Sequence, residues 1–255
     1  MISNERVMDR VETLSYMESK IGSDRIVVPR YNDGEYFLMN EKWSGLHGSI
    51  DFNVLPDLLK KSIKVKGQLL CINYLKPHNI EKKDRWYDTQ RYLIDISRND
   101  LYGCANWATH DFQNKNGVLP FLFSGQVLLV TGHPEEGRLA FEKTQPNLNI
   151  YPMPKKDASK VYEKVKLELK NLCESNNFDN ILFACGPVGK VLLADLVDIC
   201  GSNLIDLGAV INAIMNEYSQ GDKSLVDQWY MSWAQKDINL KECADDFFNK
   251  LEELG

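Results

Sequence analysis

The chain has 255 residues, of which 44% are hydrophobic and 26% are charged, and its formal net charge is −6. The hydrophobic share is enough for a sizeable core. The negative balance excludes the basic footprint with which proteins bind nucleic acid or acidic membranes through charge alone. The length fits one large domain or two small ones. Because no internal repeat, low-complexity tract or linker marks a boundary, we expect a single domain over residues 1–255.

The apolar runs and the cysteines set expectations about location. No run reaches the roughly 18 apolar residues of a membrane-spanning helix, and residues 1–20 are charged throughout, unlike a signal peptide. We therefore expect no membrane span. The six cysteines are widely spaced and form no C-x-x-C pair; they are Cys71, Cys104, Cys173, Cys185, Cys200 and Cys243. This usage predicts structural thiols and a reduced, cytoplasmic location.

The first predicted element is an amphipathic helix over residues 4–21. Its apolar positions lie three or four residues apart, at Val7, Val11, Leu14 and Met17. That spacing is typical of one buried helix face, and the following Gly22 marks its end.

The stretch after the first predicted strand is polar and acidic. Residues 26–28 are β-branched and apolar, as in a buried strand, and Asn32, Asp33 and Gly34 form a turn signal. In an open α/β sheet, ligands bind where the strands end. The carboxylates of Asp33 and Glu35 suit a divalent cation beside a phosphate, because Mg²⁺ and Mn²⁺ combine one or two carboxylates with phosphate oxygens. The alternative interpretation is a solvated surface turn.

The next segments alternate between helix and strand signals. We expect helices at residues 36–39, 55–63 and 86–97, strands at 68–73 and 101–106, and a flexible loop at 43–50 that carries His47. The strand at 101–106 ends in Trp107, Thr109, His110 and Asp111, which combine a ring face with hydrogen-bonding groups for a sugar. The alternative there is a capped loop with one packed tryptophan.

The middle of the chain continues the alternation. Residues 126–132 form an apolar strand that would deliver Thr131 and Gly132 to a ligand-binding edge, and a helix follows. A short strand at 148–151 precedes a long amphipathic helix that we expect Asp157 to cap. Strands alternating with helices at this spacing predict an α/β fold, with a doubly wound, mostly parallel, Rossmann-like sheet and helices on both faces.

A second informative stretch lies at residues 181–190. A buried strand leads directly into Gly186, and Pro187 suits the first position of a helix. The N–H groups at a helix N-terminus attract phosphate, and Lys190 adds a positive charge one turn in. The stretch is neither a Walker loop nor a G-x-G-x-x-G fingerprint. A joint used only for packing is the alternative.

The last predicted strand, at residues 203–207, carries Asp206 and is followed by Gly208. Beyond it, the sequence predicts a final amphipathic helix at 240–254. The aromatic cluster between them suits packing, an acceptor surface or a homo-oligomer contact, and consists of Trp229, Tyr230 and Trp233.

Together these stretches resemble the GT-D-fold glycosyltransferases, a family once known as a domain of unknown function. That family has an Arg-x-x-Asp-Gly-Glu signature after its first strand, which is found here at residues 30–35. It also has a Gly-Pro strand-to-helix joint and an Asp-x-Gly strand end, which are found here at 186–187 and 206–208. The resemblance implies a GT-D type fold, with Asp33 and Glu35 as ligands of the metal and diphosphate of a nucleotide-sugar donor. It also implies that Arg30 orients them.

The resemblance is weaker after Gly208. Members of the family place a histidine there, whereas this chain has Ala209. A third metal ligand, or a group that activates the acceptor, is therefore in doubt at this position.

Our hypothesis is a glycosyltransferase that uses Mn²⁺ or Mg²⁺ and a nucleotide-sugar donor, with a UDP-sugar favoured. Asp206 and His110 are the candidate catalytic bases. The candidate donor-binding residues lie in the predicted loops at the strand ends, and are Arg30, Asn32, Gly34, Thr131, Gly132, Gly186, Pro187, Lys190 and Gly208.

Two alternatives stay open for the function. One is a Rossmann-like nucleotide enzyme of another class, such as a methyltransferase, that uses the joint at Gly186. The other is an inactive nucleotide-binding module. The acceptor is open as well: a glycan, a glycosylated protein and a modified nucleic-acid base all fit, although the acidic balance disfavours the last.

Overall fold

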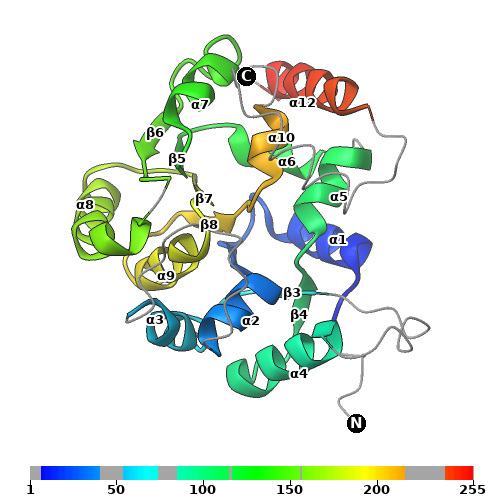
Figure 1. The fold of residues 1–255 in the computed structure, drawn as a ribbon. Coiled ribbons are helices and arrows are strands. Elements are labelled where there is room, and N and C mark those ends of the chain that lie inside the picture. The colour runs from blue at the N-terminus through cyan, green and yellow to red at the C-terminus, as the bar shows by residue number, and fades with distance from the viewer. Residues whose placement is uncertain are drawn as a thin grey trace.

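A computed structural model describes residues 7–40, 54–73, 85–114, 117–155, 157–215 and 239–254 (Figure 1). Its strands are β1 (Val27–Val28), β2 (Arg30–Tyr31), β3 (Leu70–Ile72), β4 (Tyr102–Cys104), β5 (Val127–Thr131), β6 (Asn149–Pro152), β7 (Asn180–Ala184) and β8 (Asn203–Asp206). All pairings among these strands are parallel.

The strands β1 and β2 are two halves of one central strand. Pro29 lies between them and has no backbone N–H, so it interrupts the ladder, although its carbonyl still accepts a bond from the Cys71 N–H at 2.9 Å. β1 pairs with β8 and β2 pairs with β3. The two sheets are therefore joined in the order β4-β3-β2/β1-β8-β7-β5-β6. This is the predicted doubly wound arrangement, with every described strand ending at the same edge.

Helices cover both faces of this sheet. They are α1 (Arg10–Lys20), α2 (Asp33–Met39), α3 (Leu55–Ser62), α4 (Arg85–Ser97), α5 (Trp107–Asn114), α6 (Val118–Phe123), α7 (Pro134–Phe141), α8 (Tyr162–Ser175), α9 (Pro187–Leu196), α10 (Val210–Ile214) and α12 (Leu240–Leu254), with a 3₁₀ turn at Ala158–Val161. Residues of α2, α3, α4, α8 and α9 share one hydrophobic cluster with one side of the strands. Residues of α1, α5, α6, α7, α10 and α12 share the other (Figure 1).

Alternation along the strands builds these two cores. Leu128 and Val130 of β5 face the first cluster, whereas Val127 and Leu129 face the second. Successive side chains of a strand point to opposite faces of the sheet, so an apolar run buried on both sides supplies both cores. This explains why the most apolar segments of the sequence became the central strands.

Several sequence predictions need correction. Residue Val7 is not helical: it forms a β-bridge with Tyr102, and α1 begins only after Asp9, whose side chain accepts bonds from the N–H groups of Val11 and Glu12. Val11 is 55% exposed and does not belong to the buried stripe. The predicted loop after residue 106 is the helix α5 instead.

The expected cap of the long helix is also wrong. Asp157 has a left-handed backbone conformation, with φ 57°, and makes no capping hydrogen bond. It pairs with Lys160 at 3.3 Å instead, and a 3₁₀ turn precedes α8.

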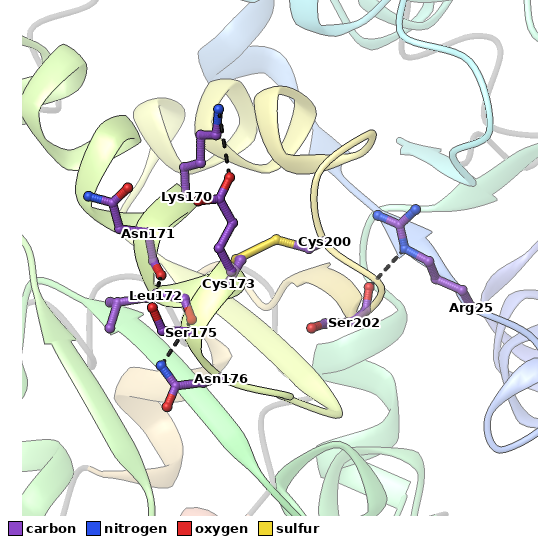
Figure 2. Close-up of a disulfide and its surroundings, with 10 residues drawn as sticks. Arg25, Lys170, Asn171, Leu172, Cys173, Ser175, Asn176, Cys200 and Ser202 are labelled. Carbon is purple, nitrogen blue, oxygen red and sulfur yellow. Dashed lines mark hydrogen bonds and ion pairs between the residues drawn. A yellow bond between two sulfur atoms is a disulfide. The ribbon is translucent and has the colours of Figure 1, made fainter.

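The expectation of structural thiols fails for two cysteines. Cys173 of α8 and Cys200, which follows α9, form a disulfide with Cα atoms 5.7 Å apart (Figure 2). The separation of 27 residues gives no signal in the sequence. Cys71, Cys104, Cys185 and Cys243 form no disulfide within the described ranges. Disulfides are typical of oxidising compartments, so the cytoplasmic location stays a prediction.

The disulfide closes the α8–α9 unit onto the segment that leads into β8. The carbonyl of Ser202, two residues after Cys200, accepts a hydrogen bond from Arg25 Nε at 2.9 Å (Figure 2). The bonded cysteine thus lies beside a contact that holds β8 next to the start of β1. No helix within the described ranges is long and apolar enough to cross a bilayer.

Reduction of the disulfide should destabilise the fold. Closing a loop of this length lowers the entropy of the unfolded chain, which corresponds to about 3.5 kcal/mol of stability. We expect urea unfolding of the wild type to show a loss of about that size in dithiothreitol. The double variant Cys173→Ser/Cys200→Ser should not respond to the reductant. Alkylation of all six cysteines in denatured, unreduced protein would show that the bond does not form.

Candidate functional site

The candidate site lies where the strand order reverses. The chain winds outward from β2 to β3 and β4, while β8, β7, β5 and β6 lie on the other side of β1. In doubly wound sheets the crevice at the carboxyl ends of the strands beside this point is the usual ligand site. Here the adjoining ends belong to β2, which leads into residues 32–35, and to β8, which ends at Asp206.

A buried lysine joins these two strand ends. Lys190 Nζ lies 3.1 Å from Glu35 Oε1 and 2.8 Å from Asp206 Oδ2. The three residues are only 5%, 7% and 2% exposed, in that order. The structure therefore brings together three residues that the sequence placed in three separate motifs.

The lysine is held in its charged form. Burial acts to lower the pKa of Lys190, but the charges of Asp206 and Glu35 outweigh it and raise that pKa well above the ordinary value. Buried charges are tolerated when opposite charges lie in contact. Here the attraction between the ammonium and the two carboxylates offsets the free-energy cost of removing all three from water.

Arg30 braces the same strand ends from the other face. Its guanidinium is 3% exposed and donates to the carbonyls of Ala105, at 2.5 Å, and of Leu207. Gly208 packs directly on it: an added Cβ at Gly208 would lie 2.1 Å from Arg30 Nη1. The φ of Gly208 is +60°, which also favours glycine. Arg30 thus orients the backbone of the loops, and Gly208 is needed for that contact.

The turn that begins α2 uses Glu35 as a second anchor. Glu35 Oε2 accepts the backbone N–H of Asn32 at 2.9 Å. Asp33 is the first residue of α2 and is half-buried, as is Gly34. The side chain of Asn32 faces the backbone N–H of Glu35 in a capping box, so the two residues hold the start of α2 together.

The cation expected from the sequence fits only part of this geometry. Asp33 is a suitable ligand for Mn²⁺ or Mg²⁺ beside a diphosphate. Glu35 is less suitable, because one of its oxygens holds Asn32 and the other holds Lys190. No group of three possible metal-ligating side chains occurs within the described ranges. Joint ligation by Asp33 and Glu35 stays a prediction, and in this arrangement it requires that Lys190 leave Glu35.

The joint between β7 and α9 has the form of a ligand-binding turn. Gly186 caps α9 with φ 69° and ψ −151°, a conformation available essentially to glycine alone, and Pro187 is the first helical residue. Apart from its neighbours in the chain, no described residue lies within 4 Å of where a Cβ at Gly186 would be. The backbone there is therefore approachable. Lys190 is not turned toward that space: apart from a 3.5 Å contact with the Gly186 carbonyl, it is committed to the carboxylates.

Three other predicted site residues lie apart from this cluster. Thr131 is fully buried at the end of β5, two strands from β8, and its hydroxyl accepts the His133 N–H at 3.1 Å. The neighbouring Gly132 packs near Lys155. His110 lies on α5, which packs on α1, α6, α10 and α12, and its ring bonds to Asn114 at 2.7 Å. Burial, together with the nearby Arg10 charge, lowers the pKa of His110.

The aromatic exit of β4 is a core element. Trp107 is completely buried in the cluster of α5, α6 and α12, so its ring is not available to stack on a sugar. Asp111 accepts the N–H groups of Val118 and Leu119, at 3.3 and 2.7 Å, and so caps the start of α6. The packing alternative is correct here. The predicted loop with His47 and the aromatic cluster Trp229, Tyr230 and Trp233 lie outside the described residues.

Comparison with solved structures places this fold. One similar structure is described as a highly conserved domain of unknown function, 1792, with a distinct glycosyltransferase fold. The two share 23% sequence identity and a TM-score of 0.54, over 92% of this chain and 84% of that one. The chain has a glycosyltransferase fold. No family model matches it, and no curated protein matches it significantly.

The sequence identified most members of the site but not how they pair. Lys190 was expected to add charge for a phosphate, whereas it neutralises Glu35 and Asp206. The carbonyls of Ala105 and Leu207, which hold Arg30, were not anticipated. Every residue has a backbone carbonyl whatever its side chain, so the sequence could not show which carbonyls bind Arg30.

Removing the buried ammonium should be costly. Lys190→Met leaves Glu35 and Asp206 without a counter-charge, and breaking such a pair typically costs about 3–5 kcal/mol. The matched control is Lys170→Met on α8, because Lys170 is 46% exposed and lies 3.7 Å from Glu174. The control should lose less than about 1 kcal/mol. Urea unfolding measures both variants, and equal losses would show that the buried triad adds nothing.

Proposed function

We propose that this protein transfers a sugar from a nucleotide diphosphate donor to an acceptor hydroxyl. One observation carries the proposal: within a glycosyltransferase fold, the acidic turn, the Gly186 joint and the end of β8 converge on Lys190 at the strand-order reversal. A convergence of buried charged groups at this place is characteristic of a ligand site and is rare in packing alone.

The donor diphosphate is proposed to lie at the start of α9. The first N–H groups of a helix have no partner within it and, with the helix dipole, favour an anion. Gly186, the N-cap of α9, has open space beside it among the described residues. Pro187, the first helical residue, has no backbone N–H, so the N–H groups available to an anion are those of the residues that follow. Asn32, the N-cap of α2, is proposed to contact the nucleoside or the sugar.

A divalent cation, Mn²⁺ or Mg²⁺, is proposed to accompany the donor at Asp33. When bound, such an ion neutralises charge on the diphosphate as the glycosidic bond breaks. The chain itself supplies Asp33 at the first position of α2, and Glu35 in the same turn bonds to the Asn32 N–H and so fixes the start of the helix. Glu35 therefore positions Asp33 whether or not it also contacts the ion.

Of the two proposed bases, only Asp206 lies in the cluster. Its Oδ1 accepts the Gly208 N–H at 2.9 Å and its Oδ2 pairs with Lys190 at 2.8 Å. Asp206 would therefore accept a proton from the acceptor while it is held by these two contacts. His110 bonds to Asn114 and packs with α5 on the other face of the sheet. Asp206 is therefore the proposed base.

The proposed partners follow from this chemistry. The donor is a nucleotide sugar, with a UDP-sugar favoured. The acceptor is a glycan, a glycosylated protein or a modified nucleic-acid base, and homo-oligomerisation remains a prediction. An inactive nucleotide-binding module and a Rossmann-like enzyme of another class are the outcomes against which the following experiments discriminate.

Donor binding should depend on the cation. At ten times its Kd, a ligand that binds only the folded state adds about 1.4 kcal/mol of stability. We expect UDP to stabilise the wild type by about that amount in Mn²⁺ and by much less in EDTA. Asp33→Asn should abolish the difference. Thermal unfolding measures this, and equal stabilisation with chelator present would remove the cation from donor binding.

Asp33→Asn should also slow the reaction while the fold persists. The loss of charge stabilisation in a transition state commonly costs about 3 kcal/mol, or a hundredfold in rate. The measurement is release of free nucleotide from a panel of nucleotide sugars, with circular dichroism as the check on folding. Asp57→Asn, an exposed carboxylate in the first turn of α3, is the matched control and should not slow release.

The same assay separates the alternatives. Absence of release by the wild type with every donor, despite donor binding, would favour the inactive module. Release that persists undiminished in Asp33→Asn would move the catalytic centre away from the acidic turn.

A further inference from the structure

The ammonium of Lys190 occupies the space between two buried carboxylates. It lies 3.1 Å from Glu35 Oε1 and 2.8 Å from Asp206 Oδ2, and its side chain is 6% exposed. These carboxylates come from different motifs, the turn after β2 and the end of β8. Two ionised carboxylates that face one enclosed point are stabilised by a cation there; without one, protonation would have to neutralise at least one of them.

A divalent ion and an ammonium are alternative occupants of such a point. Mg²⁺ binds one or two carboxylates at about 2.1 Å and completes its shell with water. An ammonium also neutralises carboxylates, through charge-assisted hydrogen bonds of about 2.7–2.9 Å. The distances to Lys190 are close to that range. Lysine has the further property that it is attached to the protein and needs no uptake of an ion.

The charges of the four most buried side chains of the site balance. Glu35 and Asp206 each carry one negative charge, and Lys190 and Arg30 each carry one positive charge. Arg30 contacts Gly208, whose N–H bonds to Asp206 Oδ1 at 2.9 Å, so it belongs to the same assembly. A divalent ion added beside Glu35 would bring two uncompensated charges into a buried position. This disfavours an ion at Glu35 as long as Lys190 remains in place.

We propose that Lys190 is the resident cation of this site, standing between Glu35 and Asp206 where a divalent ion would otherwise bind. Glu35 is then a positioning residue and not a metal ligand. Removing the ammonium converts Glu35 and Asp206 into a divalent-cation site. This inference goes beyond the proposed function and does not depend on it, because it concerns ion binding by the protein alone.

The position of Lys190 in the fold explains what its ion pair with Glu35 does. The lysine lies in the first turn of α9, one turn from Gly186, and Glu35 lies in the first turn of α2. The ion pair therefore fixes two loop-to-helix turns against each other before any ligand arrives. A pre-formed site binds its ligand without the entropic cost of ordering these turns.

The experiment is a titration with Mn²⁺ alone, in which electron paramagnetic resonance measures the free ion. Lys190→Met is the central variant, because methionine follows the lysine stem as far as Cε and leaves the place of the ammonium vacant. We expect Lys190→Met to bind Mn²⁺ at least tenfold more tightly than the wild type. Lys190→Met/Glu35→Gln should lose that gain. Lys190→Arg, which keeps the charge, should show no gain.

A second comparison does not require that Lys190→Met folds. In the wild-type background, Glu35→Gln should weaken Mn²⁺ binding less than Asp33→Asn does, because each variant removes one negative charge but only Asp33 is a ligand. Weakening by Glu35→Gln as large as that by Asp33→Asn would overturn the proposal and restore Glu35 as a metal ligand. Equal Mn²⁺ affinity of folded Lys190→Met and the wild type would overturn it as well. Both readouts are independent of donor binding and turnover, so failure of the proposed function is seen separately.

Discussion

The contact of Lys190 with Glu35 and Asp206 is the interaction on which the strand-end loops depend. Each carboxylate is more than nine-tenths buried, and neither is tolerable in that environment without a positive partner. One ammonium serves both, and so couples α9, α2 and β8. Glu35 in turn holds the Asn32 N–H, which sets the start of α2 and with it the position of Asp33. The geometry of the acidic turn is thus a consequence of a charge located more than 150 residues further along the chain.

A second constraint acts on the opposite face of the same strands. Arg30 reaches the carbonyls of Ala105 and Leu207, beyond the ends of β4 and β8. These acceptors are backbone carbonyls that lie beyond the strand pairing, and a buried carbonyl requires a hydrogen-bond donor. Only glycine fits at position 208, because a Cβ there would overlap the Arg30 guanidinium. The two braces together, one on each face, make the edge of the sheet rigid where its strand order reverses.

Much of the fold was readable from the sequence because the sheet is buried on both faces. A strand covered on both sides reads as a continuous apolar run, and the runs in residues 126–132 and 181–185 became β5 and β7. Short helices were harder to predict. Polar residues dominate α5, with Thr109, His110 and Asp111 in succession, so its helical period is hidden and the stretch looked like a strand exit. Pro29 likewise concealed the continuation of the central strand, because the ladder tolerates it through its carbonyl.

The sequence predicted which residues belong to the site but not which of them pair. Strand ends gave Asp33, Glu35, Gly186 and Asp206, because residues at the carboxyl ends of parallel strands converge. The partner of each charge depends on how the first turn of α9 meets the first turn of α2, which is a tertiary fact. The same limit applies to Cys173 and Cys200, whose proximity follows from the packing of α8 on α9.

A neutral cluster has a consequence for the ligand. Because Glu35, Asp206, Lys190 and Arg30 cancel, they attract neither an anion nor a cation strongly at a distance. The N-terminus of α9 offers the equivalent of about half a positive charge, which is less than the negative charge on a diphosphate. A donor of that kind must therefore bring part of its own compensation, and a divalent ion bound to its phosphates is the usual form. Asp33, at the first position of α2 and outside the buried triad, is the carboxylate that we propose for such an ion. Under the proposed function, the lysine and the divalent ion would have separate roles: the lysine neutralises the buried carboxylates, and the ion would accompany the donor.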